Sequence, residues 1–297
     1  MKSTRKQLAS ARVASKNQLP GRRFMARALA ITAVIATSMH GAWAVTYTVD
    51  ETTTAAFGTV NQANVPPGFG ENSCVPTATM NSFTWLQNAY PLIYGLDGGG
   101  APALQGGQGS WQAAAALLAG PQYMNTDLNN GTTLANWISG KVSYLNAFAP
   151  GKTIFAGMET LSGVGRPVWD QNANPTVNFL LQELQAGEDV ELGIYPTSDI
   201  GHALTLTGLI WNDADNNGAF NAGDILTLNT IDPVNPLVNT PLTLNPGNPM
   251  TIFGLNYNNY TLKVALAESP VPEPGTLALT SSGLAALLFI ARRRQGK

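Results

Sequence analysis

The sequence is poor in charged residues and in cysteine, and both shortages restrict what the protein can be. Charged residues make up 11% of the 297-residue chain, about half of what an average soluble domain carries. Cys74 is the one cysteine, so no intramolecular disulfide can form. The 30 glycines follow no triplet period, which excludes a collagen-like rod. A hydrophobic content of 44% fits a globular chain of one or two domains rather than a disordered one.

Basic residues are scarce in the middle of the chain. Eight of the 16 lysines and arginines lie within residues 1–27 and four within 292–297. The stretch between these two segments contains four lysines and arginines and all 18 acidic residues, so its formal net charge is −14. Such an acidic body offers no cationic surface to replace the counterions of a phosphate backbone, so we expect no nucleic-acid partner. The acidity suits an exported protein and a divalent cation.

The first 44 residues have the order of a signal peptide. A basic segment up to Arg27 precedes about twelve apolar residues, and Ala42-Trp43-Ala44 follows as a small-x-small cleavage site. The apolar run is too short to cross a bilayer, which needs about twenty residues. We therefore predict a secretory signal peptide over residues 1–44 that is cut after Ala44.

Residues 271–297 combine a Pro-Glu-Pro motif, an uncharged run and a basic cluster. Pro272-Glu273-Pro274 is followed by sixteen uncharged residues, 275–290, and then by Arg292-Arg293-Arg294. Physically this is an extended motif, a short membrane span and a positive cytoplasmic stop. The order resembles the PEP-CTERM sorting signal of Gram-negative bacteria, with an ordinary tail anchor as the alternative. The resemblance implies transient membrane insertion, cleavage by an exosortase, and delivery of the body to the cell-envelope surface or the outside.

Residues 45–270 remain as one domain, and its cysteine lies at the start of a predicted helix. Pro76 fits only the first turn of a helix, where its missing N–H is not required. Cys74 therefore lies at or just before the helix N-terminus, where the macrodipole and unpaired N–H groups favour the thiolate. The alternative is a small buried hydrophobic residue. The helical pattern is carried by apolar residues at three- and four-residue steps, namely Met80, Phe83, Leu86 and Tyr90.

The one histidine of this domain, His202, begins a predicted strand. Residues 177–186 have a helical pattern, and a short alternating strand around Leu192 follows them. His202 shares its face with Leu204 and Leu206, so it points inward from a half-buried strand. A core histidine with its hydrogen bonds satisfied is the alternative.

Cys74 at a helix start and Gly201-His202 at a strand start resemble the papain-like cysteine peptidases, particularly the bacterial double-glycine type. The two residues are 128 positions apart, near the roughly 130–150 typical of papain-type enzymes. The resemblance implies an α+β fold in which a helical half carrying the cysteine packs on an antiparallel β-sheet carrying the histidine and an acidic residue. Asp232, at the end of the next predicted strand, matches that third position and would orient the imidazole. A plain Asp-Pro turn is its alternative.

The sequence departs from this family pattern at two positions beside the cysteine. The family commonly has a glutamine six residues before the cysteine, where it forms the oxyanion hole, and Gly68 stands there. Val75 stands where the family often has glycine. Asn72 or Gln62 would then supply the oxyanion donor, together with the Cys74 backbone N–H.

Residues 213–224 have the spacing of an EF-hand calcium loop. Oxygen-bearing side chains occupy loop positions 1, 3, 5, 9 and 12, and Gly218 at position 6 permits the sharp turn. The flanks, 203–211 and 225–231, have strand patterns, so we predict a metal-clipped hairpin, with a polar turn as the alternative. The expected ligands of a structural Ca²⁺ are Asp213, Asp215, Asn217, Ala219, Asn221 and Asp224.

These patterns predict an exported cysteine peptidase, or a related acyl transferase, that cleaves peptide or amide bonds through Cys74, His202 and Asp232. The expected partners are a peptide or protein substrate and the exosortase. The rival is a non-catalytic, calcium-binding surface or extracellular-matrix protein with the same fold.

Overall fold

The computed structural model describes residues 43–65, 68, 70–95, 103–161, 166–196, 201–253 and 257–271. All of them belong to one compact unit, residues 33–297. The predicted signal peptide lies outside the described residues except for 43–44, and the C-terminal sorting segment lies outside them except for Val271. Within the described ranges, no helix is both long enough and apolar enough to span a membrane.

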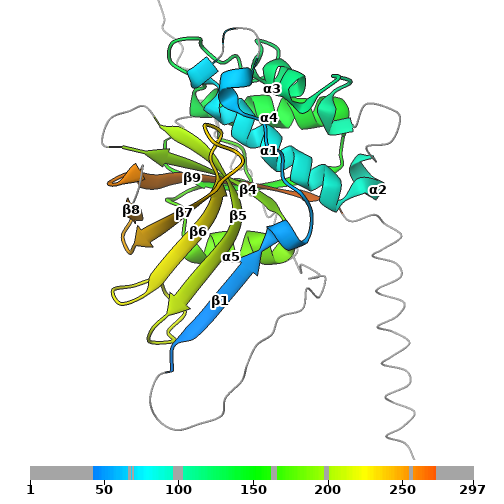
Figure 1. The fold of residues 1–297 in the computed structure, drawn as a ribbon. Helices are drawn as coiled ribbons and strands as arrows, with labels where there is room; N and C mark the ends of the chain where they lie inside the picture. The colour runs from blue at the N-terminus through cyan, green and yellow to red at the C-terminus, as the bar shows by residue number, and fades with distance from the viewer. Residues whose placement is uncertain are drawn as a thin grey trace, which may run out of the picture. The chain divides into compact units, whose positions relative to one another are not determined.

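The N-terminal part of this unit is mainly helical (Figure 1). Side chains cap the N-termini of three helices: Ser110 Oγ accepts from the Ala113 N–H at 3.1 Å, Thr133 Oγ1 from the Asn136 N–H at 3.3 Å, and Thr176 Oγ1 from the Phe179 N–H at 3.1 Å. The helices are α1 (Cys74–Ala89), α2 (Pro91–Tyr94), α3 (Trp111–Ala119), α4 (Leu134–Phe148) and, between strands, α5 (Val177–Ala186). Short 3₁₀ turns occupy η1 (Glu51–Thr53), η2 (Gln62–Asn64), η3 (Gly70–Asn72) and η4 (Ala103–Gln105).

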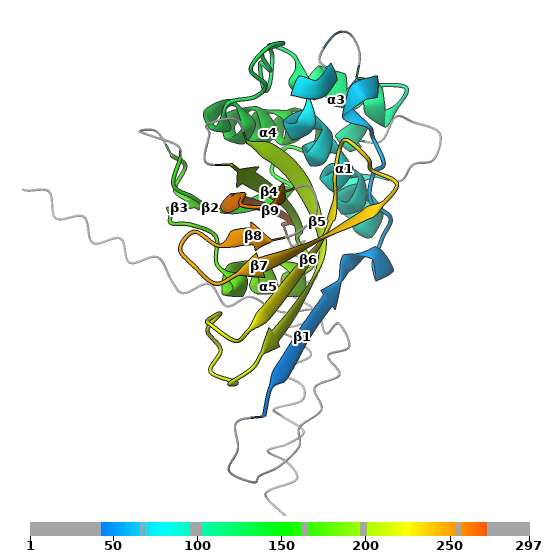
Figure 2. The same cartoon turned by 60° about the vertical axis from the view of Figure 1, so that its left-hand side comes forward.

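The strands form a closed antiparallel barrel with extensions at its sides (Figure 2). Among the described residues, six strands close in the order β4-β5-β6-β7-β8-β9, and β9 pairs back with β4. Strand β1 extends from β5, β2 extends from β9, and β3 adds to β2 in parallel. The bounds are β1 (Val45–Asp50), β2 (Thr153–Glu159), β3 (Asp170–Asn172), β4 (Asp189–Tyr195), β5 (His202–Asp213), β6 (Ile225–Ile231), β7 (Asn239–Asn245), β8 (Thr251–Phe253) and β9 (Thr261–Pro270).

Two apolar cores hold the unit together. Alternate residues of the barrel strands, such as Leu204 and Leu206 on β5, fill the barrel interior, and α5 packs against them. The second core lies between the N-terminal helices and the outer wall of the barrel, where Ala203, Val264 and Leu266 face the helices. Strands β4, β5 and β9 are therefore buried on both faces, and this double burial fixes the position of α1 relative to β5.

The mixed α+β class is confirmed, with N-terminal helices packed on an antiparallel barrel. The predicted helix 177–186 and the predicted strand 225–231 have the observed bounds. The sequence predicted an antiparallel sheet, and the structure adds that the sheet closes on itself.

Candidate active site

Cys74 is the first residue of α1, as predicted, and it is partly exposed. The preceding residue, Ser73, does not cap the helix with its side chain; its hydroxyl lies 3.0 Å from the Gln62 carbonyl oxygen and 2.7 Å from that of Gly70. These contacts tie the two upstream turns to the helix start. The Cys74 N–H forms no hydrogen bond with any described residue, as expected for the first turn of a helix.

His202 begins β5 and Asp232 directly follows β6, so the β5–β6 hairpin brings both to one end of the barrel. His202 Nε2 lies 2.9 Å from Asp232 Oδ1. The same Oδ1 accepts from the Val234 N–H at 2.9 Å, and Oδ2 accepts from the Tyr257 hydroxyl. Both carboxylate oxygens are therefore held, and the imidazole has a fixed partner.

His202 and Cys74 influence each other's ionisation: His202 lowers the pKa of the Cys74 thiol, and Cys74 helps to raise the pKa of the His202 imidazole. Because Nε2 faces Asp232, Nδ1 is the ring nitrogen available to the sulfur. The backbone groups of Val75 and Ala203 also lower the pKa of the thiol. The structure thus brings Cys74, His202 and Asp232 together, with a hydrogen bond between His202 and Asp232, although they come from α1, the start of β5 and the end of β6.

The surroundings favour a thiolate beside an imidazolium. Burial alone raises the pKa of Cys74, but the hydrogen bond and charge of His202 outweigh it and lower the pKa below its usual value. Burial alone lowers the pKa of His202, but the hydrogen bonds to Asp232 and Cys74 raise it to about 9. Burial likewise raises the pKa of Asp232, and the bonds from His202 and Tyr257 reverse that effect. These shifts favour an ionised thiol beside a protonated imidazole and an ionised carboxylate.

The two predicted oxyanion donors are engaged elsewhere. The Asn72 side-chain amide donates to the Leu128 carbonyl oxygen at 2.6 Å. Gln62 is buried, its Nε2 donates to the Glu71 carbonyl oxygen at 3.0 Å, and its Oε1 has no hydrogen-bond partner among the described residues. Either amide would have to leave its present acceptor before it could bind a substrate oxygen.

Two tyrosines beside this candidate site were missed by the sequence reasoning. The ring of Tyr257 stacks on that of His202, with centroids 5.5 Å apart and planes 19° apart. Burial, and then the nearby negative charges of Cys74 and Glu159, raise the pKa of Tyr195 to about 12. A Cβ at Gly201 would lie 2.5 Å from the Tyr195 ring, so the close approach requires glycine before the histidine. No spacing rule marks either tyrosine in the sequence.

The predicted calcium loop closes the opposite end of the β5–β6 hairpin. One carboxylate oxygen from each of Asp213, Asp215 and Asp224 lies within 4.8 Å of the others, so the cluster could bind a metal ion. Eleven residue steps of β5, or about 36 Å at about 3.3 Å each, separate Asp213 from His202. The two buried carboxylates accept backbone N–H groups of the loop: Asp213 from Asn217 (3.2 Å) and Gly218 (2.8 Å), and Asp224 from Ala214 (2.8 Å) and Asn221 (3.0 Å).

The remaining predicted ligands also lie within this loop. Asn217 Nδ2 donates to Asp215 Oδ2 at 2.7 Å, and Asn221 Nδ2 lies 3.1 Å from the Ala219 carbonyl oxygen. In the described part of the chain, no lysine, arginine or histidine forms an ion pair with the three carboxylates. The donor set is oxygen only and net negative, which suits a hard divalent cation.

A second acidic cluster, also missed from the sequence, lies between the helices and the barrel wall. Asp189 and Glu191 of β4 and Glu268 of β9 are buried, with a carboxylate oxygen of each within 4.8 Å of the others. Lys141 of α4, fully buried, forms ion pairs with Glu191 and, at 2.6 Å, with Glu268. This cluster already contains its own cation.

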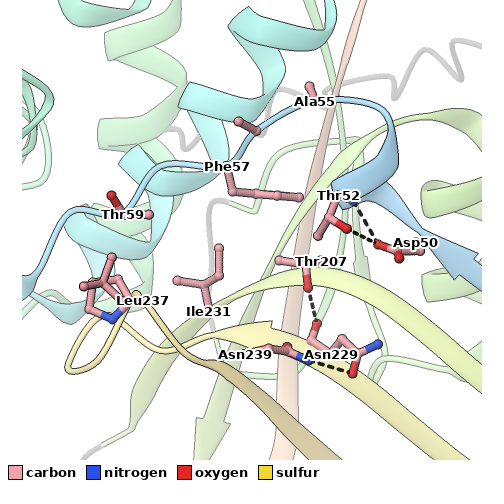
Figure 3. Close-up of a pocket in the computed structure, with 12 residues that line it drawn as sticks. Asp50, Thr52, Ala55, Phe57, Thr59, Thr207, Asn229, Ile231, Leu237 and Asn239 are labelled. Atoms are coloured by element: carbon pink, nitrogen blue, oxygen red, sulfur yellow. Dashed lines mark hydrogen bonds between the residues drawn. The ribbon is translucent and has the colours of Figure 1, made fainter.

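The pocket in Figure 3 is separate from Cys74 and His202. Its lining includes Thr207, Asn229 and Ile231, which lie on the outer face of β5 and β6. The drawn polar groups bond to one another, as when Thr207 Oγ1 donates to the Asn229 carbonyl oxygen at 3.1 Å. Cys74, His202 and Asp232 are not among the residues that line this pocket.

Comparison with known proteins yields one match, at the C-terminus. Residues 270–295 match the family model described as the PEP-CTERM protein-sorting motif. No curated protein matches the chain. The motif indicates an exported protein sorted to the cell surface and implies processing by an exosortase.

Proposed function

We propose that this exported protein is a cysteine peptidase, or a related acyl transferase, with a papain-like arrangement of helical and barrel halves. The observation that carries the proposal is the grouping of Cys74, His202 and Asp232, in which His202 lies 2.9 Å from Asp232 and lowers the pKa of Cys74. A helix start supplies the nucleophile, and two neighbouring barrel strands supply the base and its orienting carboxylate. These are the roles that acyl transfer requires, and unrelated folds meet them with the same geometry.

In the proposed reaction, the Cys74 thiolate attacks the carbonyl carbon of a peptide or amide, and the carbonyl oxygen becomes an oxyanion. His202 then donates its Nδ1 proton to the leaving amine, the C–N bond breaks, and an acyl-thioester on Cys74 remains. Water, or an amine in a transfer reaction, attacks the thioester while His202 takes up the proton. The C–S bond then breaks, which releases the carboxylic acid or the new amide and regenerates the Cys74 thiolate. Asp232 remains ionised throughout and keeps Nε2 oriented.

The unpaired Cys74 N–H is one donor for the oxyanion, because it lies at the start of α1 with no acceptor among the described residues. Asn72 and Gln62 are the candidates for a second donor. Each would exchange its present backbone acceptor for the substrate oxygen. Gln62→Ala and Asn72→Ala separate them, since removing one oxyanion donor lowers kcat by about 10²–10³-fold.

The proposal is tested by labelling with a cysteine-directed epoxide and by the pH dependence of iodoacetamide alkylation. Cys74 is the one cysteine, so any labelling reports on it alone. We expect alkylation to persist well below the pH range of a free thiol, and His202→Ala to shift the profile to that of an ordinary cysteine. Asp127→Ala is a matched control, because this exposed side chain bonds only within its own turn.

An unshifted wild-type profile that His202→Ala leaves unchanged would overturn the peptidase proposal. The non-catalytic surface protein would then be the better description of the chain. Loss of peptide hydrolysis in Cys74→Ser and in His202→Ala, with no further loss in the double variant, would support the proposal, because residues that act as one unit are not additive.

We also propose that the loop from Asp213 to Asp224 binds Ca²⁺ in a structural role. Its ligands would be the three carboxylates, the Asn217 and Asn221 amide oxygens and the Ala219 carbonyl. The ion would neutralise charge and fix the register of the hairpin that carries His202. Ligand binding to the folded state alone stabilises it by about 2.7 kcal/mol at a hundredfold excess over Kd.

Calcium should therefore raise the melting temperature of the wild type relative to chelator. Asp213→Ala with Asp215→Ala should abolish that difference, whereas Asp127→Ala, which removes an acidic residue outside the loop, should preserve it. Identical wild-type melting curves with calcium and with chelator would refute the calcium site, and the loop would then be a polar turn without a metal.

A further inference from the structure

We infer that Tyr257 is a positioning residue of the proposed site: its hydroxyl fixes the carboxylate of Asp232 while its ring fixes the plane of His202. The role rests on the proposed function, since it concerns the same thiol–imidazole–carboxylate group. Nothing in the papain-like resemblance assigns a tyrosine to this position.

The position of Tyr257 is set by the barrel and not by the residues it contacts in the site. It lies in the turn between β8 and β9, and it is 9% exposed, within the core of the barrel. Its carbonyl oxygen accepts from the Tyr260 N–H at 3.0 Å, and its ring meets that of Tyr260 edge-on at 5.3 Å. The Tyr260 carbonyl oxygen in turn accepts from the Ile252 N–H at 2.7 Å. These contacts within the barrel hold Tyr257 in place independently of its hydrogen bond to Asp232.

The hydroxyl restricts rotation of the Asp232 carboxylate. Oδ1 is shared by His202 Nε2 and the Val234 N–H, both at 2.9 Å, and Oδ2 is bound by Tyr257. Turning the carboxylate away from the imidazole would break all three bonds. Burial and the charge of Asp232 raise the pKa of Tyr257, so the hydroxyl keeps its proton and remains a donor.

The ring restricts the imidazole itself. Tyr257 and His202 are nearly parallel, with an interplanar angle of 19° and a centroid separation of 5.5 Å. A tilt of the imidazole large enough to move Nδ1 away from the sulfur would collide with this ring or lose the stacking contact. One side chain thus controls both the direction of the Asp232–His202 bond and the plane in which His202 faces Cys74.

The two contacts can be separated by substitution. Tyr257→Phe keeps the ring and removes the hydroxyl, whereas Tyr257→Leu removes both contacts. Tyr260→Phe is the matched control, because Tyr260 lies in the same turn and contacts Tyr257 but forms no hydrogen bond to Asp232.

The readout is the pH profile of iodoacetamide alkylation of Cys74 in the full chain, with melting temperatures measured in parallel. We expect Tyr257→Phe to move the acid limb upward by about one pH unit, or about tenfold in rate on that limb, the size expected for losing one hydrogen bond to a charged group. Tyr257→Leu should move it further, and Tyr260→Phe should retain the wild-type profile. In an Asp232→Asn background, Tyr257→Phe should cause no further shift, because the hydroxyl acts through Asp232.

The outcomes distinguish this inference from the proposed function. A wild-type profile like that of a free thiol refutes the site itself. A perturbed wild-type profile that Tyr257→Phe leaves unchanged refutes only the role of Tyr257. If Tyr257→Phe fails to fold, the shift of the His202 imidazole NMR signals between wild type and Asp232→Asn decides: signals that do not move with Asp232 would overturn the inference.

Discussion

Lys141→Met is expected to destabilise the protein severely, although it replaces one long side chain by another and lies outside the proposed active site. Lys141 is fully buried between α4 and the barrel wall, where it is the cation for Glu191 and Glu268. Asp189 lies beside them, with Ser82 Oγ donating to its Oδ2 at 2.8 Å. Without the ammonium, three carboxylates would remain in a site that excludes water.

The magnitude follows from that geometry. Removing one partner of a buried ion pair costs about 3–5 kcal/mol, because the remaining charge is buried and unpaired. For a domain of 150–250 residues, each kcal/mol lowers Tm by about 2–4 °C, so the expected loss is about 6–20 °C. Each of the three carboxylates already has one oxygen without a hydrogen-bond partner among the described residues, so no spare donor there compensates for the loss.

The assay is chemical denaturation and thermal melting of Lys141→Met beside Lys152→Met, in which the replaced lysine is exposed. Lys152→Met should change the free energy of unfolding by less than about 0.5 kcal/mol. Adding Glu191→Gln and Glu268→Gln to Lys141→Met should restore most of the loss, because the unpaired charges are then removed. The Lys141→Met defect should also grow from pH 5 to pH 9, since protonation relieves the carboxylates at low pH.

A loss below about 1 kcal/mol at pH 8 would refute this reasoning. It would mean that the cluster is neutral without Lys141 or open to water in solution. Failure of the two glutamine substitutions to restore stability would show that the lysine contributes by packing of its aliphatic stem rather than by charge.

Three further outcomes are expected. Burial raises the pKa values of Asp189 to about 8 and of Glu188 to about 9. An acid whose pKa is raised on folding stabilises the folded state below its unfolded pKa, and this contribution is lost as the pH rises through the folded pKa. The wild-type Tm should therefore fall between pH 5 and pH 9, and a Tm that rises over that range would contradict this reasoning. Gly201→Ala should suppress low-pH alkylation of Cys74, because the new Cβ would meet the Tyr195 ring at 2.5 Å, whereas Gly109→Ala, with open space around it, should be neutral in the same assay. Mass spectrometry of the exported protein should find a start near Val45 and no Arg292–Arg294 tail, and an intact C-terminus would argue against removal of the sorting segment.

The sequence predicted those parts of the fold whose signals are local. The helical step from Met80 to Tyr90, with Pro76 in the first turn, located α1 and placed Cys74 at its start. Alternation around Leu204 located β5 and the inward face of His202. Barrel closure could not be predicted, because it depends on β9 pairing with β4 across more than sixty residues, and no local pattern encodes such a pairing.

The buried cluster illustrates a different limit. Asp189 and Glu191 alternate with Val190 and Leu192, the pattern of a strand with one face in water. The structure buries that polar face, because α1 and α4 cover the outer wall of the barrel there. Whether a polar strand face meets water or a helix depends on tertiary packing. No local sequence pattern around Lys141, fifty residues before Glu191, indicates that it pairs with Glu191 and Glu268.

The hairpin β5–β6 connects the two proposed sites through one set of backbone hydrogen bonds. The register that pairs Asn212 with Ile225 beside the acidic loop also pairs Thr205 with Ile231 next to Asp232, apart from a shift between Leu206 and Gly208. Because a slip of one residue would turn every side chain to the opposite face, a cation that fixes the loop also keeps His202 and Asp232 facing each other. The bulge near Gly208 limits that coupling, since it lets the two ends of the ladder adjust separately. Chelator should therefore loosen the His202–Asp232 pair less than it loosens the loop, and the loss of Cys74 reactivity should be partial.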